Sequence, residues 1–132
     1  MRITPLDMED SSSPWNGRQI DQQTDLEELL EESQQKRPFL LELEGENGFK
    51  LIIGIGGPLG CVQFSAANGN PPYLMAATKS TQEEELDVEF LAGGTPTPIP
   101  MHRCFPFEMV KKLVFRFFEH GDRSPEVQWE EV

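Results

Sequence analysis

Cysteine and basic residues are both scarce in this 132-residue chain, and each scarcity argues against a class of protein. Two cysteines, Cys61 and Cys104, cannot build the dense disulfide framework of a small secreted domain, so we expect reduced core thiols in a cytoplasmic protein. Only 11 lysines and arginines stand against 23 acidic residues, which gives a net charge of −12. Phosphate binding depends on clustered cations, so the composition argues against nucleic acid as a direct ligand. A basic protein is the better expectation for a partner.

Long apolar runs are also missing. No stretch approaches the roughly 20 apolar residues that a membrane-spanning helix needs, so we expect no membrane contact. Residues 1–10 lack the basic stretch followed by an apolar one that marks a secretory signal, which again favours the cytoplasm. With 37% hydrophobic residues and nine phenylalanines, the chain still has enough apolar material for one folded domain.

The beginning of the chain divides into two parts. Residues 1–23 are polar and irregular, and they predict an irregular N-terminal arm with Trp15 as its candidate contact with the body. The domain itself is expected over residues 24–132. Thr24 and Glu27 have the spacing of a capping box, and leucines follow at helical spacing. This pattern predicts a helix of about ten residues that ends before Pro38.

Alternating apolar and polar residues predict several strands. The three clearest follow one another and should form an antiparallel meander over residues 39–44, 49–55 and 59–65. Weaker alternation predicts further strands over residues 73–78, 86–90 and 127–131. The proline-rich segment from Thr95 to Pro100 is expected to exclude regular structure.

A second helix is predicted between Pro106 and Gly121. Apolar residues recur along one of its faces at Val110, Leu113, Val114, Phe117 and Phe118. Such a stripe has to cover a sheet. The expected fold is therefore α+β: a single domain with a mainly antiparallel sheet of about five to six strands packed against two helices.

Residues that could support catalysis or metal binding are few. The soft metal ligands are Cys61, His102, Cys104 and His120, and none of them shows the spacing of a zinc site, so we expect no metal and no cofactor. His102 and Cys104 could serve as base and nucleophile, but the sequence identifies no third group to orient them. We expect a buried thiol and a surface imidazole, and no enzyme.

A glycine-rich stretch raises the possibility of a phosphate-binding loop. Glycines stand at positions 54, 56, 57 and 60, but Leu59 occupies the place of the third glycine in a dinucleotide fingerprint. A strand is predicted to follow instead of a helix. A tight turn between two strands is the expected structure.

Acidic residues gather in two runs. Six lie within residues 21–32 and five within residues 83–89, with no basic residue in either run. Clustered like charges repel one another, so the runs serve either solubility or the steering of a cationic partner, and charge alone leaves both open. Glu83, Glu84 and Glu85 lie in or beside a loop between strands, where an acidic protrusion could enter a basic cleft.

The end of the chain carries a recognisable pattern. The second helix closes on Phe117 and Phe118, a turn containing Arg123 and Pro125 follows, and the last strand holds Trp129. This pattern resembles the first family of immunity proteins from bacterial polymorphic toxin systems. The order of the upstream elements is similar as well, so the resemblance extends over about residues 24–131.

The resemblance implies a non-enzymatic α+β protein that binds and neutralises a cognate toxin, usually a member of the nucleic-acid deaminase superfamily. It implies no small-molecule substrate. Such toxins need a basic site for nucleic acid, which we expect four acidic residues to occlude: Glu83, Glu84, Glu85 and Asp87. The motif residues Arg123, Pro125 and Trp129 are expected to be structural, with Trp129 facing the second helix. The alternative is a small acidic regulatory or scaffold protein with an unrelated partner.

The predicted stripe of the second helix can be tested by mutation. We expect Phe117→Ala to lower the free energy of unfolding by about 3 to 5 kcal/mol, because a buried ring is replaced by a cavity. Urea denaturation of the two proteins measures the difference. An unchanged melting temperature would mean that Phe117 does not face the core.

Overall fold

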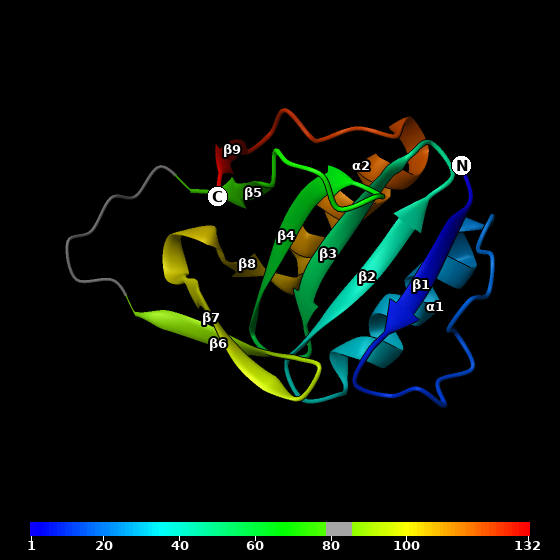
Figure 1. Ribbon diagram of the computed structural model, residues 1–132, viewed down its shortest axis with the longest axis horizontal. Helices are drawn as coiled ribbons and strands as arrows, with labels where there is room; N and C mark the ends of the chain where they lie inside the picture. Colours follow the sequence, from blue (N-terminus) through cyan, green and yellow to red (C-terminus); the bar gives the residue numbers. More distant parts are fainter. Residues whose placement is uncertain (79–85) are drawn as a thin grey trace.

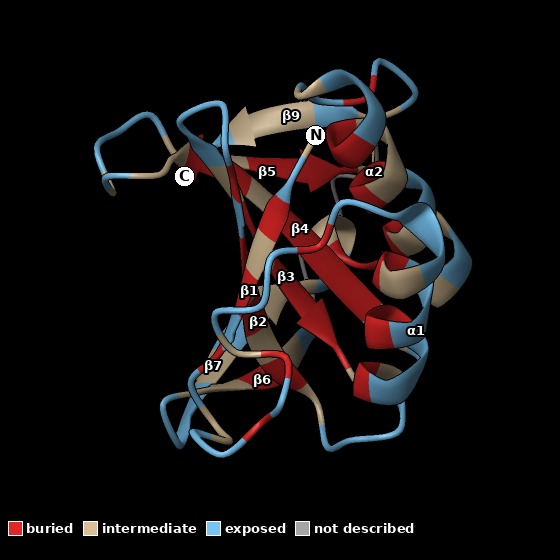
Figure 2. Ribbon diagram, turned by 90° about the vertical axis from the view of Figure 1, so that its right-hand side faces the viewer, coloured by how far each residue is buried: buried red, intermediate tan, exposed pale blue. Residues whose placement is uncertain are grey.

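Two helices pack on one face of a curled sheet, and the other face stays largely open (Figures 1 and 2). The computed structural model describes residues 1–78 and 86–132. In chain order the elements are β1 (Ile3–Asp7), α1 (Gln23–Gln34), β2 (Phe39–Gly45), β3 (Phe49–Ile55), β4 (Leu59–Ala66), β5 (Leu74–Ala77), β6 (Asp87–Ala92), β7 (Thr95–Pro100), the 3₁₀ helix η1 (Met101–Arg103), β8 (Phe105–Pro106), α2 (Phe107–His120) and β9 (Gln128–Glu131).

The sheet is mixed but mostly antiparallel. Its order is β7-β6-β2-β3-β4-β5-β9, with β1 also paired to β2 and β8 to β4. The parallel contact is that of β2 with β6, through the single register pair Phe39 and Leu91. The predicted α+β class is confirmed, and the sheet has more strands than the five to six expected. No helix in the described part of the chain is long and apolar enough to cross a membrane.

The main core lies between the sheet and the helices. Each residue of the predicted α2 stripe is buried, and Phe117 is completely inaccessible to solvent. The Phe117 ring meets Phe64 of β4 edge to face, with 6.0 Å between the ring centres. Gly121 ends the helix in the left-handed conformation, with φ of 75°, and its N–H donates to the Phe117 carbonyl. The predicted second helix and its buried face are confirmed.

A smaller core lies on the opposite face of the sheet. It contains Cys61, Met75, Phe90 and Cys104, and the β6–β7 hairpin contributes to it through Phe90. Gly54 makes this packing possible, because a Cβ there would lie only 2.7 Å from Phe90 and from the Cys61 sulfur. The hairpin therefore covers part of the outer face and leaves the rest exposed.

The first helix begins two residues earlier than the capping box requires. Gln22 is the N-cap residue and makes no side-chain capping bond, so the prediction that Thr24 caps the helix is wrong. Thr24 lies inside the first turn and not in front of it. Its side chain is therefore not placed to accept from the unpaired N–H groups at the start of the helix, as an N-cap residue does. The helix ends at Gln34, before Pro38 as predicted, and buries Leu26, Leu29 and Leu30.

The segment from Thr95 to Pro100 was expected to be irregular, but it forms strand β7 along its whole length. Its prolines at positions 96, 98 and 100 alternate, so all three share one side of the strand. An antiparallel strand turns only every second N–H toward its neighbour. Strand β7 is at the edge of the sheet, so the three prolines, which have no N–H group, can face the side where no strand pairs.

The N-terminal segment was expected to be an irregular arm, but Ile3–Asp7 forms strand β1 beside β2. The alternation in residues 3–7 covers only five residues of a polar segment, so it is a weak strand signal. No hairpin joins β1 to β2, because α1 lies between them in the chain. Trp15 is buried, as its predicted docking requires, and its indole N–H donates to Glu32 of α1 over 2.6 Å.

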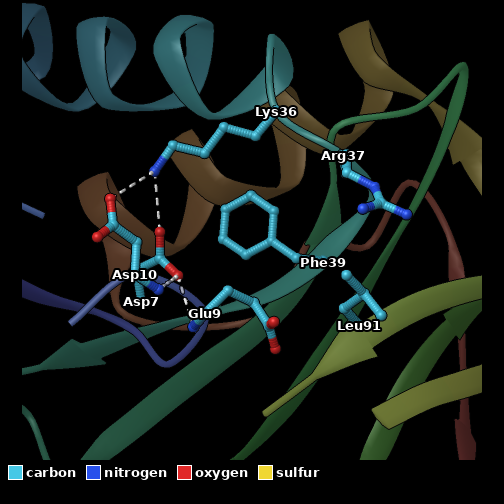
Figure 3. A pocket seen from close by; sticks show the side chains of 7 residues that line it. All are labelled: Asp7, Glu9, Asp10, Lys36, Arg37, Phe39 and Leu91. Atoms are coloured by element: carbon cyan, nitrogen blue, oxygen red, sulfur yellow. Dashed lines mark hydrogen bonds and ion pairs between the residues drawn. The ribbon is translucent and has the colours of Figure 1, made fainter. Parts of the chain in front are cut away.

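A buried carboxylate fixes the end of β1. Asp7 is 4% exposed and accepts from the Lys36 ammonium at 2.9 Å and from the backbone N–H groups of Glu9 and Asp10 (Figure 3). Asp10 is half exposed and lies 4.0 Å from the same ammonium. These bonds tie the N-terminal segment to the residues that follow α1.

The role of Asp7 gives a prediction about stability. We expect Asp7→Ala to lower the free energy of unfolding by about 1 to 3 kcal/mol, because two backbone donors and an ammonium lose their acceptor. Asp10→Ala is the control and should cost less, since the Asp10 side chain is half exposed and Asp7 is buried. Equal losses in urea denaturation would contradict this account.

Candidate functional site

Asp87 is the one predicted binding residue whose surroundings can be described. It is exposed at the start of β6, opposite Pro100 of β7. Leu86 precedes it and is 74% exposed. The other three predicted residues, Glu83, Glu84 and Glu85, lie outside the described residues.

Both described ends of the β5–β6 connection are fastened to η1. On the β5 side, Thr78 donates from its backbone N–H and from its hydroxyl to the His102 carbonyl, over 2.7 and 3.1 Å. On the β6 side, the Leu86 carbonyl accepts from the N–H of Met101 over 3.0 Å. Two adjacent residues of η1 therefore hold the chain where the acidic run leaves the sheet and where it returns.

Strand β6 presents two acidic side chains that form no ion pair within the described part of the chain. Asp87 and Glu89 are exposed and point away from the second core, whereas Phe90 points into it. Neither forms an ion pair with another described residue, and β7 beside them carries no charged side chain. Their charges therefore face solvent and are accessible to a binding partner.

Helix α2 covers one face of the sheet (Figure 2), and its basic side chains have acidic partners. Lys111 pairs with Glu31, Lys112 with Glu126 and Arg116 with Asp122, at distances of 3.0, 3.3 and 3.1 Å. The cations of α2 are therefore paired, whereas Asp87 and Glu89 of β6, like the exposed Glu27 and Glu28 of α1, form no ion pair with a described residue.

A polar cluster joins η1 to the last strand. The Glu130 carboxylate lies 3.0 Å from Nε2 of His102 and accepts from Nε of Arg103 at 2.9 Å. Hydrogen bonds from His102 and then from Arg103 lower the pKa of Glu130 below its ordinary value of 4.5. Residues this far apart in the sequence meet only because β9 pairs with β5, so no pattern in the sequence could have indicated the cluster.

The candidate nucleophile is not arranged for catalysis. Cys104 is buried, with its sulfur near the carbonyls of Ile99 and Pro100. The other thiol, Cys61, has its pKa raised to about 12, chiefly by burial and also by the nearby Cys104. Within residues 1–78 and 86–132, no three His, Cys, Asp or Glu side chains gather as a metal site needs.

The glycine-rich stretch is the turn between β3 and β4. A Cβ on Gly56 would lie 2.6 Å from the Lys36 carbonyl, so glycine is needed for the close approach of two backbones. The Gln34 amide closes the contact by accepting from the N–H of Gly56 and donating to the Gly57 carbonyl. The predicted tight turn is confirmed.

The motif residues near the C-terminus make contacts within the molecule. The Trp129 indole N–H donates to the Ser124 carbonyl over 2.9 Å, and its ring packs against the main core. The Arg123 guanidinium lies 5.4 Å from the centre of the Phe64 ring. Pro125 is exposed in the turn between α2 and β9.

The chain is similar to a known protein family. Residues 11–131 match the family model described as Immunity protein Imm1. The match begins within the segment that was expected to be an arm and continues almost to the last residue. No curated protein matches the chain.

The Glu130 cluster predicts a pH-dependent contribution to stability. A carboxylate with a lowered pKa stabilises the fold above its ordinary value and loses that effect as the pH falls through the lowered value. We expect Glu130→Gln to cost at most about 1 kcal/mol at pH 7, because the cluster is partly exposed, and nothing once Glu130 is protonated. Urea denaturation at pH 7 and at successively lower pH measures this, with the neighbouring Glu131→Gln as control. A cost of Glu130→Gln that does not decline as the pH falls would contradict the account.

Proposed function

This chain belongs to the Imm1 family of immunity proteins, and from that premise we propose how it neutralises its toxin. The family function is to bind a cognate toxin. The toxin proposed for this chain is a deaminase that acts on nucleic acid, and the binding residues are Glu83, Glu84, Glu85 and Asp87. The protein acts in the cytoplasm, where the toxin would otherwise reach its substrate.

The observation that carries this proposal is the pair of exposed acidic side chains on β6. Asp87 and Glu89 are exposed and have no ionic partner among the described residues. Adjacent like charges cost stability in the free protein. A cationic partner relieves that repulsion, and these two acids follow Glu83, Glu84 and Glu85 in the sequence.

The chemistry of the proposed toxin fits this surface. A nucleic-acid deaminase must admit a single-stranded or extruded base, and channels that hold single strands are lined with basic side chains. Carboxylates of the β5–β6 connection take the places of phosphates in such a channel. The attachment of both ends to η1 supports this role, because it fixes where the acidic run leaves the body.

The same reasoning separates binding residues from structural ones. Arg123, Pro125 and Trp129 serve the fold in this proposal, since the first and last contact the body through Phe64 and Ser124. Cofactors and small-molecule substrates play no part in it.

Replacing the acidic run tests the proposal. We expect the triple variant Glu83→Lys, Glu84→Lys, Glu85→Lys to bind the toxin domain encoded beside this gene with an association rate at least about tenfold lower at low salt. Cells that produce the toxin should lose protection with it. Surface plasmon resonance at two salt concentrations and a co-expression survival assay measure the two effects.

The control changes the net charge equally at another place. Asp21, Glu27 and Glu28 are exposed at and near the start of α1, and their triple replacement by Lys alters the charge by the same amount. This control should retain most of the association rate. Equal losses in both triples would reduce the acidic run to a general charge effect, and a normal rate in the first triple would overturn the proposed binding residues.

A further inference from the structure

An apolar groove opens on the face of the sheet that the helices do not cover. It has a volume of about 360 Å³, and it is lined by Met8, Leu40, Glu42, Ile52, Ala92 and Gly93. We call it the sheet-face groove. Neither the main core nor the acidic run accounts for it.

The floor of the groove follows from strand register. Leu40 pairs with Gly54 and Ile52 with Glu42, so all four lie in the outward-facing phase of β2 and β3. Their neighbours in both strands point toward the helices and are buried. An outward position on a sheet with one open face normally carries a polar residue. Leu40 is apolar because it packs against the second core, whereas Ile52 is a partly exposed apolar residue that belongs to neither core.

The wall of the groove adds more exposed apolar surface. Met8 follows β1 and is 65% exposed, and Leu6 lies on the same face opposite Glu42 with 39% exposure. A solvent-exposed methionine beside an apolar floor is costly unless something covers it.

The groove is held in shape by two polar contacts. The N–H of Gly94, at the tip of the β6–β7 hairpin, donates to Glu9 over 2.7 Å. Across the floor, the Lys50 ammonium pairs with Glu42 over 2.6 Å. Hairpin, N-terminal segment and sheet are therefore already positioned, so little ordering is required when a ligand enters.

The charges at its rim indicate what could enter. Lys50 compensates Glu42. Glu9, which follows the lining residue Met8 and holds the tip of the hairpin through Gly94, has no cationic partner among the described residues, so the charge beside the groove is negative. A second copy of this chain would place the same acidic rim against itself in a two-fold interface, with a net charge of −12 on each copy. An apolar side chain flanked by basic groups, on a cationic protein, is complementary to this site.

We infer that the sheet-face groove is a second contact site for the cognate toxin, which inserts an apolar side chain flanked by basic residues. This inference rests on the proposed function. Ala92 and Asp87 are the two ends of β6, about 17 Å apart at the usual rise of a strand. One partner covering about 800 Å² of this protein can reach both.

The two contacts should affect different rate constants. Exposed acidic groups steer the encounter and act on association, whereas a buried apolar contact acts on dissociation. A variant that removes apolar character without changing charge therefore isolates the groove from the acidic run.

Met8→Gln is such a variant, and Met109→Gln on α2, a partly buried residue beside the main core, is a control on the other side of the molecule. With the toxin domain encoded beside this gene as the probe, we expect Met8→Gln and Ile52→Gln each to raise the dissociation rate about tenfold. Association rates and melting temperatures should stay close to those of the unchanged protein, and Met109→Gln should change neither rate constant.

Each outcome decides something. Unchanged dissociation in both groove variants overturns the groove while leaving the proposed function intact. If the unchanged protein forms no complex with the toxin domain, the proposed function fails and the groove assignment with it. If sedimentation of the chain alone shows a dimer that Met8→Gln dissociates, a second copy fills the groove and the inference is wrong.

Discussion

The packing of α2 on strands β2 to β4 is the interaction on which the rest of the structure depends. Burial of the Phe117 face in the main core selects which side of the sheet turns inward. Since side chains alternate along a strand, that choice also decides which residues face out. Leu40 and Ile52 are outside because their neighbours are needed inside. The open face is therefore a consequence of the core, and so is the groove upon it.

Ion pairs are unevenly distributed over the surface. The cations of α2 are paired with acids, as Lys111 is with Glu31. The β6 strand has acids and no counter-ions among the described residues, and Glu27 and Glu28 of α1 are exposed acids as well. The β6 acids stand beside an anchored connection, and that position fits a surface that meets a basic partner, as expected of an immunity protein.

Much of the fold was predictable because local periodicity carries it. The meander of β2, β3 and β4 and the stripe of α2 were both visible as repeats of apolar residues. The errors occurred where tertiary context overrides local preference. Three prolines forbid a central strand, but in β7 they lie at an edge that needs no further pairing. Strand β1 was missed because its partner β2 lies more than thirty residues later.

The sequence by itself determined the α+β class, the family resemblance and the acidic run, since each is a matter of residue type and spacing along the chain. Only the tertiary structure decided which residues share a surface. Glu130 meets His102 and Arg103, and Met8 and Ile52 line one groove, across separations that no periodicity encodes. The physical reason is that strand pairing and sheet curvature bring distant segments together, and both depend on the packing of the whole domain.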